Sequence, residues 1–186
     1  MKKSNFTAVV KRVLSIMLVF VLMVSFTGTI NAEAKTKKIS LKYCNFSGLV
    51  DYHEVEPFAK SVKKGTYNVT IQCKKGWANG YLKFTAPASK TYKITASKLS
   101  TGKGKFANGH VSFMKVDSYG GLAYTDGVVK GQKQSAMHIA SRKTGIVPAS
   151  LSGKIYLEQG ETLYIYNSFL YSARNTKKGS FKLVIK

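Results

Sequence analysis

Alternation of apolar and polar residues along short segments is the feature of this sequence that most limits its fold. The segments KISLKY from Lys38, YNVTIQC from Tyr67, TYKITAS from Thr91 and FKLVIK from Phe181 all show it. Successive side chains of a β-strand point to opposite faces, so each segment has one apolar and one polar face. We therefore predict half-buried strands, with one face toward a core and the other toward water.

The rest of the chain indicates more strands and little helix. Less regular candidates are YLKFTA, VSFMKVD and SAMHIAS, separated by clusters of Gly, Asn, Ser and Lys that are typical of turns. One short helix is expected around Glu56 to Val62, with Pro57 near its start. About nine or ten strands in one domain predict an all-β fold. We expect a single antiparallel, jelly-roll-like β-sandwich, with any binding carried by loops at its rim.

The first 34 residues have the layout of a helical secretory signal peptide. Four basic residues precede an uncharged run from Val13 to Phe26, and the small-x-small sequence AEA follows at Ala32–Ala34. The run is short for a membrane span of ~20 residues, so we predict cleavage after Ala34 rather than an uncleaved anchor. The expected parts are a signal peptide at 1–34, an N-terminal extension at 35–65 that can add a strand, and a β-sandwich domain at 66–186. We expect a secreted, extracellular protein whose only contact with the membrane is through the signal peptide before cleavage.

The charge of the chain favours anionic partners. The sequence has 30 Lys and Arg against 8 Asp and Glu, a formal charge of +22. Without residues 1–34 the charge is +19, and nearly all of it comes from lysine. Lysine is a hydrated point charge without the planar fork of arginine, which favours diffuse attraction over specific nucleic-acid recognition. Teichoic acids and acidic glycans of the cell envelope are therefore candidate partners. In the alternative interpretation the lysines serve only solubility and the protection of sheet edges.

The stretch GKIYLEQGETLYIYNS, Gly153 to Ser168, is predicted to be a β-hairpin. Gly160 allows a positive φ, so EQGE is a suitable tight turn between two strands. Alternation directs Leu157, Leu163 and Ile165 toward the core. Tyr164 and Tyr166 share the opposite face, where they either pack along the sheet or form a platform for sugars.

Two motifs resemble the pre-peptidase C-terminal (PPC) domains of secreted bacterial proteins. The stretch YLKFTAPASKTYKITAS resembles the F-x-A-P-x-S-G-x-Y pattern of that family, and the predicted hairpin resembles its late L-x-x-G-x-x-Y segment. The matching residues are Phe84, Ala86, Pro87, Ser89, Tyr92, Ile94, Leu157, Gly160, Tyr164 and Ile165, followed by a last strand at Gly179 to Lys186. The resemblance implies a β-sandwich that is usually non-catalytic. The acidic residues that accompany calcium in some members are replaced by WANGYLK, so no calcium site is carried over.

Few residues suit catalysis, and we predict no enzyme and no cofactor. Asp51, His53, Glu54 and Glu56 form the one cluster of titratable groups, and a solvated acidic turn explains it as well as a metal or acid–base site does. Activity that is lost on mutation of Asp51 or Glu54 would instead indicate a hydrolase. Cys44 and Cys73 either form a disulfide, which export permits, or remain two thiols.

One aromatic loop is the candidate for ligand contact. Trp77 is the only tryptophan and lies between glycines, next to Lys74 and Lys75. Its ring can stack on a sugar while the ammonium groups meet an anion, although a packing role at the end of the sandwich fits equally. With Lys103 and Lys105 of a neighbouring loop, these residues form the predicted binding rim. The predicted function is a non-catalytic module that binds an anionic polymer or glycan of the cell envelope and is retained at the wall by charge. The alternative is a structural module that binds another surface protein.

Overall fold

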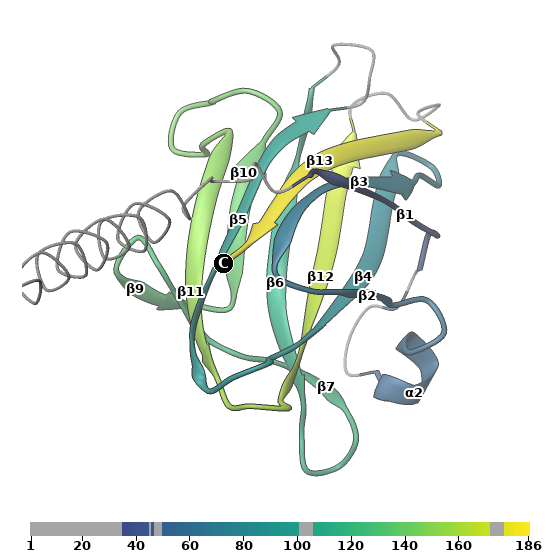
Figure 1. Ribbon diagram of the computed structural model, residues 1–186. Coiled ribbons are helices and arrows are strands. Elements are labelled where there is room, and N and C mark those ends of the chain that lie inside the picture. The colour runs from purple at the N-terminus through teal and green to yellow at the C-terminus, as the bar shows by residue number, and fades with distance from the viewer. Residues whose placement is uncertain (1–34, 45, 47–49, 101–105, 172–176) are drawn as a thin grey trace, which may run out of the picture. The chain divides into compact units, whose positions relative to one another are not determined.

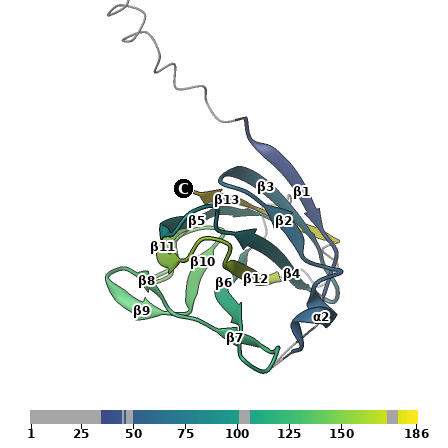
Figure 2. The same cartoon turned by 60° about the horizontal axis from the view of Figure 1, so that its bottom comes forward.

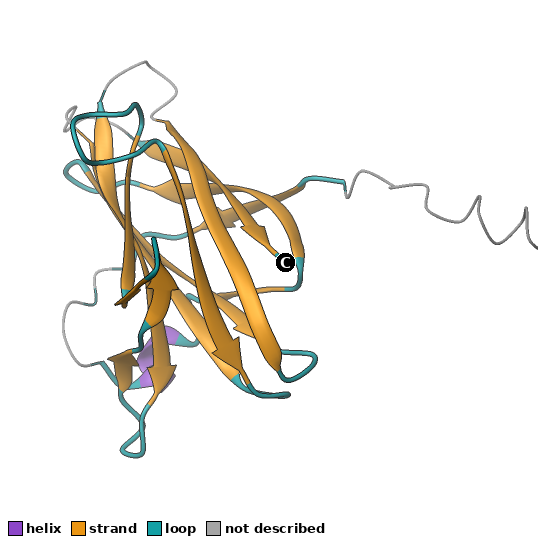
Figure 3. Ribbon diagram, turned by 90° about the vertical axis from the view of Figure 1, so that its left-hand side faces the viewer, coloured by secondary structure: helices purple, strands orange, loops and turns teal. Residues whose placement is uncertain are grey.

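The structure, a computed structural model, describes residues 35–44, 46, 50–100, 106–171 and 177–186. The predicted signal peptide lies outside these residues. Thr36–Lys186 form one compact unit, almost entirely of strands, and its single described helix is the short one in Figure 3. The strands are β1 (Lys37–Leu41), β2 (Lys60–Val62), β3 (Gly65–Gln72), β4 (Trp77–Thr85), β5 (Lys90–Ser100), β6 (Ala107–Val116), β7 (Leu122–Tyr124), β8 (Gly127–Val129), β9 (Gln132–Gln134), β10 (Ala136–Ala140), β11 (Ser150–Leu157), β12 (Thr162–Tyr171) and β13 (Lys178–Ile185), and the helix is α2 (Tyr52–Val55).

Two sheets pack face to face, so the predicted β-sandwich is confirmed (Figures 1 and 2). The seven-stranded sheet has the order β1-β3-β13-β5-β11-β8-β9. The six-stranded sheet has the order β10-β6-β12-β4-β2, with β7 paired to β6. Most neighbours are antiparallel, but the edge strands β1 and β2 pair parallel with β3 and β4. Both belong to the segment 35–65, which therefore adds one strand to each sheet.

The predicted hairpin at Gly153 to Ser168 is wrong, because its two arms lie in different sheets. β11 pairs with β5 and β8, whereas β12 pairs with β4 and β6. Gly160 does take a positive φ of 83°, but its turn carries the chain across the sandwich. The adjacent β4–β5 crossing supports it, since Gly160 N donates to Ala86 O at 2.8 Å. The burial patterns give the physical reason: β11 alternates, whereas β12 is buried on both faces and needs cover above and below.

That cover is a second apolar cluster on the outer face of the six-stranded sheet. The main core between the sheets contains the predicted inward residues, including Leu157, Leu163 and Ile165. The second cluster contains Tyr164 and Tyr166 together with residues from α2 and its surroundings. The two tyrosines thus pack under a second layer, one of the two outcomes that the sequence allowed.

The helix expected at Glu56 to Val62 is also displaced. α2 begins earlier because Asp51 caps it, accepting a hydrogen bond from His53 N at 2.8 Å. Residues 60–62 instead form β2, because Val62 is needed in the main core. The acidic cluster therefore has a structural role: it starts α2, and Glu56 ties the end of α2 to the sheet through Lys83 and Tyr164.

Candidate functional site

Lysine is concentrated on the strands of the seven-stranded sheet. These strands hold nine lysines, Lys37, Lys38, Lys90, Lys93, Lys98, Lys133, Lys154, Lys178 and Lys182, and no Asp or Glu. The outward positions between the lysines are mostly Ser, Thr and Asn. Lys37 and Lys90 lie opposite the core residues Tyr67 and Leu157, on the inward side at the ends of their strands. The other seven lysines make the outer face of this sheet, which we call the lysine face, cationic and rich in hydrogen-bonding groups.

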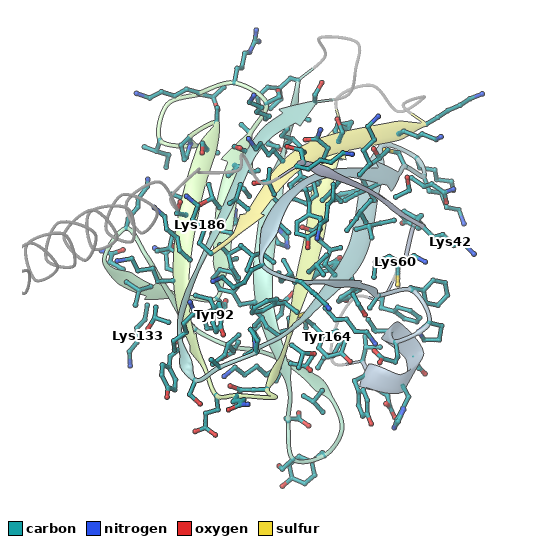
Figure 4. All side chains as sticks on the ribbon, in the orientation of Figure 1. Lys42, Lys60, Tyr92, Lys133, Tyr164 and Lys186 are labelled. Carbon is teal, nitrogen blue, oxygen red and sulfur yellow. The ribbon has the colours of Figure 1, made fainter. Side chains whose placement is uncertain are left out.

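Four lysines of the lysine face stand side by side across neighbouring strands, and we call them the lysine row. Lys186 and Lys93 exchange both backbone hydrogen bonds, at 3.0 and 3.2 Å, and Lys93 lies opposite Lys154. Val128 separates Lys154 from Lys133 in the same register. All four side chains are exposed, and Lys133 and Lys186 are labelled in Figure 4. Like charges placed directly opposite each other on a sheet are destabilising, so the row lowers stability in the absence of a counter-charge.

A shallow hollow of about 520 Å³ lies on the lysine face beside the row. Three lysines from three strands line it: Lys38 of β1, Lys182 of β13 and Lys98 of β5. The remaining lining residues are Ile39, Ser40, Asn68, Thr70, Ser180 and Phe181. The hollow is therefore lined by cationic residues and by neutral residues with hydroxyl and amide groups, and no Asp or Glu lines it.

Lys98 reaches this face because of an irregularity in β5. Strict alternation from Ala96 would direct the side chain of Lys98 into the core. Instead, Lys182 pairs with Ser97 while Ser180 pairs with Ser100, so β5 carries one extra residue, a β-bulge. Lys98 has a φ of 54°, a left-handed conformation that costs an L-residue about 1–2 kcal/mol. The bulge keeps Leu99 in the core and leaves Lys98 exposed.

The other sheet is charged differently. Its strands hold three lysines, Lys60, Lys83 and Lys115, and the last two are ion-paired with Glu56 and Glu161. The hydrogen bond from Lys83 holds the pKa of Glu56 below its usual value. Partial burial raises the pKa of Glu161, but hydrogen bonds from Lys115 and the Glu158 backbone outweigh this and lower it. Glu56 and Glu161 thus neutralise two lysines of the six-stranded sheet, and within the described part of the chain no ion pair involves a lysine of the lysine face.

The described residues of the predicted binding rim lie at the turn between β3 and β4, which joins the two sheets. Lys74 and Trp77 exchange backbone hydrogen bonds around Lys75 and Gly76, which both have positive φ, so this is a tight two-residue turn. The Trp77 side chain is 45% exposed and starts β4 in the six-stranded sheet. Lys74 Nζ lies 6.0 Å from the centre of the Tyr43 ring. The other two predicted rim residues, Lys103 and Lys105, lie outside the described residues.

Sequence reasoning did not pair the two histidines on the six-stranded sheet. His110 of β6 lies directly opposite His138 of β10, and their ring centres are 5.7 Å apart. Burial, together with the charge of His138, lowers the pKa of His110. Among the described residues, no group of three His, Cys, Asp or Glu side chains is arranged to hold a metal ion.

Both cysteines are free thiols, in separate parts of the domain. Cys44 belongs to the second cluster, whereas Cys73 packs against the main core. Burial raises the pKa of each to about 11, so both are protonated at neutral pH. Of the two states that the sequence left open, a disulfide or two thiols, the structure contains two thiols. No helix in the described part of the chain is long and apolar enough to cross a membrane.

Comparison with known proteins finds similar structures only. No protein-family model and no curated protein matches the chain. The PPC domain of a collagenase from Bacillus anthracis is 11% identical, with a TM-score of 0.39 over 69% of this chain and 94% of that one. A family 35 carbohydrate-binding module from an environmental isolate is 13% identical (TM-score 0.31, over 78% of this chain and 87% of that one). PliG of Aeromonas hydrophila, a periplasmic inhibitor of g-type lysozyme, is 11% identical (TM-score 0.29, over 81% and 99%). The family that the sequence motifs resemble is therefore also found among the similar structures.

Proposed function

We propose that this protein is a secreted, non-catalytic β-sandwich module that binds an anionic polymer of the cell envelope or its surroundings through the lysine face. The ligand meets the outer surface of the seven-stranded sheet, rather than the loop around Trp77 that the sequence favoured. Attraction by many ammonium groups brings the polymer to the face, and the hydroxyl and amide groups between them provide the contacts at short range.

The lysine row is the observation that carries this proposal. Four lysines occupy consecutive or next-nearest strands at one register, with no acid in any strand of that sheet. Solubility alone is served better by lysines that are paired with acids, as Lys83 and Lys115 of the six-stranded sheet are, because such pairing avoids repulsion between neighbours. A linear polyanion lying across the strands would neutralise the row and remove its cost.

Binding measurements with charge-matched variants test the proposal. The double variant Lys93→Gln/Lys154→Gln removes two charges from the row, and Lys64→Gln/Lys143→Gln removes two exposed lysines from outside the strands of the lysine face. We expect the first to weaken binding to a soluble polyanion at least about tenfold and the second about twofold, with the affinity falling steeply as salt rises. Equal losses in the two variants, or binding that is independent of salt, would contradict the proposal.

A second function, contact with another surface protein, is favoured by one observation on the six-stranded sheet. Trp77 lies opposite Leu170, and these side chains are 45% and 41% exposed. Exposed aromatic and aliphatic side chains that adjoin one another are typical of protein contacts. Substitution Trp77→Ser separates the two functions, because it would impair protein contact and leave polyanion binding unchanged.

A further inference from the structure

We propose that the hollow on the lysine face is a binding site for a phosphoryl group, so that the polymer taken by this protein is a phosphodiester polymer. This inference rests on the proposed function and specifies its ligand class. The site is formed by Lys38, Lys98 and Lys182, together with the polar side chains between them.

The donors around the hollow suit phosphate better than carboxylate. A phosphoryl group presents several oxygens around a tetrahedral centre, and it accepts hydrogen bonds from several directions. Lysines from three different strands and the hydroxyl-bearing residues Ser40, Thr70 and Ser180 line the hollow, so donors are available on several sides of it. The planar carboxylate is matched best by the fork of arginine, and no arginine lines the hollow.

The strained backbone conformation of Lys98 places this residue at the hollow. Two other lysines have a positive φ, Lys75 and Lys130, and each precedes a glycine in a two-residue turn that demands this conformation. Lys98 lies within a long strand, where no turn demands it. Bulges next to functional sites re-aim a side chain, and the bulge in β5 places the Lys98 ammonium group on the lysine face.

The hollow and the lysine row are spaced for one extended ligand. Lys182 of the hollow lies in β13, and Lys186 of the row directly follows this strand, four residues further on, which corresponds to about 13 Å of extended chain. A phosphodiester chain with one phosphoryl group in the hollow can therefore place later groups along the row. A single small anion would use the hollow alone.

Substitution Lys98→Gly tests the site with little risk to folding, since glycine adopts the positive φ freely. Lys130→Gly and Lys75→Gly are matched controls, because each removes one lysine from a position with nearly the same φ outside the hollow. The probes are poly(glycerol phosphate) and poly(L-glutamate) of equal length, titrated into the purified protein at one salt concentration. We expect Lys98→Gly to weaken binding of the phosphate polymer about tenfold and of the glutamate polymer about twofold, as the controls do for both.

Nuclear magnetic resonance of the unaltered protein provides a second measurement. Inorganic phosphate should shift the amide signals of Ser40, Thr70 and Ser180 in a saturable manner, and acetate at the same ionic strength should not. If Lys98→Gly and its controls lose the same affinity for both polymers, and phosphate shifts no signal at the hollow, the phosphoryl site is refuted while polyanion binding stands. If neither polymer binds, both the phosphoryl site and the proposed function are wrong.

Discussion

Removing one charge from the lysine row should make the domain more stable. In the row, Lys154 lies directly opposite Lys93. On its other side it lies opposite Val128, and Val128 in turn lies opposite Lys133. The substitution Lys154→Gln keeps a long polar side chain on an exposed position of β11 and removes only the charge. We therefore expect a higher free energy of unfolding for the variant at low salt, because the repulsion within the row is relieved.

The size of the gain follows from the register. Directly opposite side chains on a sheet begin about 5 Å apart, and two unit charges separated by about 6 Å in water repel by roughly 0.7 kcal/mol. Lys133, at about twice the distance, adds roughly 0.4 kcal/mol. At an ionic strength of about 0.01 M, where screening is weak, the total approaches about 1 kcal/mol. At about 0.15 M, screening over ~8 Å reduces it to less than about 0.5 kcal/mol.

Urea unfolding at low and high sodium chloride measures this gain, because urea adds no ions of its own. The double-mutant cycle of Lys93→Gln and Lys154→Gln isolates the repulsion between the two residues. Lys115→Gln is the matched control: Lys115 also projects from a strand, but it is paired with Glu161, so its loss should lower the free energy of unfolding.

Two results would refute the reasoning. The first is that Lys154→Gln lowers the free energy of unfolding at low salt, as Lys115→Gln is expected to do. The second is that the increase in the free energy of unfolding persists unchanged at high salt, which would assign it to the β-strand propensity of glutamine rather than to charge. In either case, the lysine row would carry no electrostatic cost, and the main support for a polyanion ligand would be lost.

Three further predictions concern the fold around the site. The pKa of His110 is lowered in the folded state from its ordinary value of 6.5. Below pH 6.5 the unfolded chain therefore binds more protons at this residue than the folded one, so stability should fall as the pH is lowered through that range. Urea unfolding at several pH values should show this fall, and His110→Asn should remove most of it. Glu56→Gln should lower stability by about 1 kcal/mol and speed hydrogen exchange at α2, because the pair with Lys83 is lost. Gly153→Ala should cost about 1–3 kcal/mol in urea unfolding, since the added Cβ would lie 2.7 Å from the Phe113 ring.

The alternating segments predicted which side chains point inward, because strand periodicity is a local property. Tyr67, Val69 and Ile71 are buried as expected, and so are Phe181, Leu183 and Ile185. The same alternation already placed Lys93, Lys182 and Lys186 on the outward side. What the pattern lacked was the lateral order of the strands, which brings β13 between β3 and β5 although it is last in the chain.

The crossing at Gly160 shows why a local signal was not sufficient. A glycine with positive φ between two apolar segments is compatible with a hairpin and with a turn that crosses to the other sheet. The distinguishing signal was the run of apolar residues in LYIYNSFLY, which does not alternate between core and solvent as β11 does. Such a run needs cover on both faces, and residues from the segment 35–65 supply it on the outer face.

Two independent costs fall on the same face of the seven-stranded sheet. Like charges stand opposite each other in the lysine row, and Lys98 takes a left-handed conformation within a strand. Neither is needed for the fold: glycine would satisfy the bulge, and polar neutral residues would satisfy the outward positions of the row. On the six-stranded sheet, by contrast, Lys83 and Lys115 are both neutralised by carboxylates. Strain and repulsion that concentrate where a cationic hollow lies, and are relieved elsewhere, are expected if a polyanion completes the lysine face.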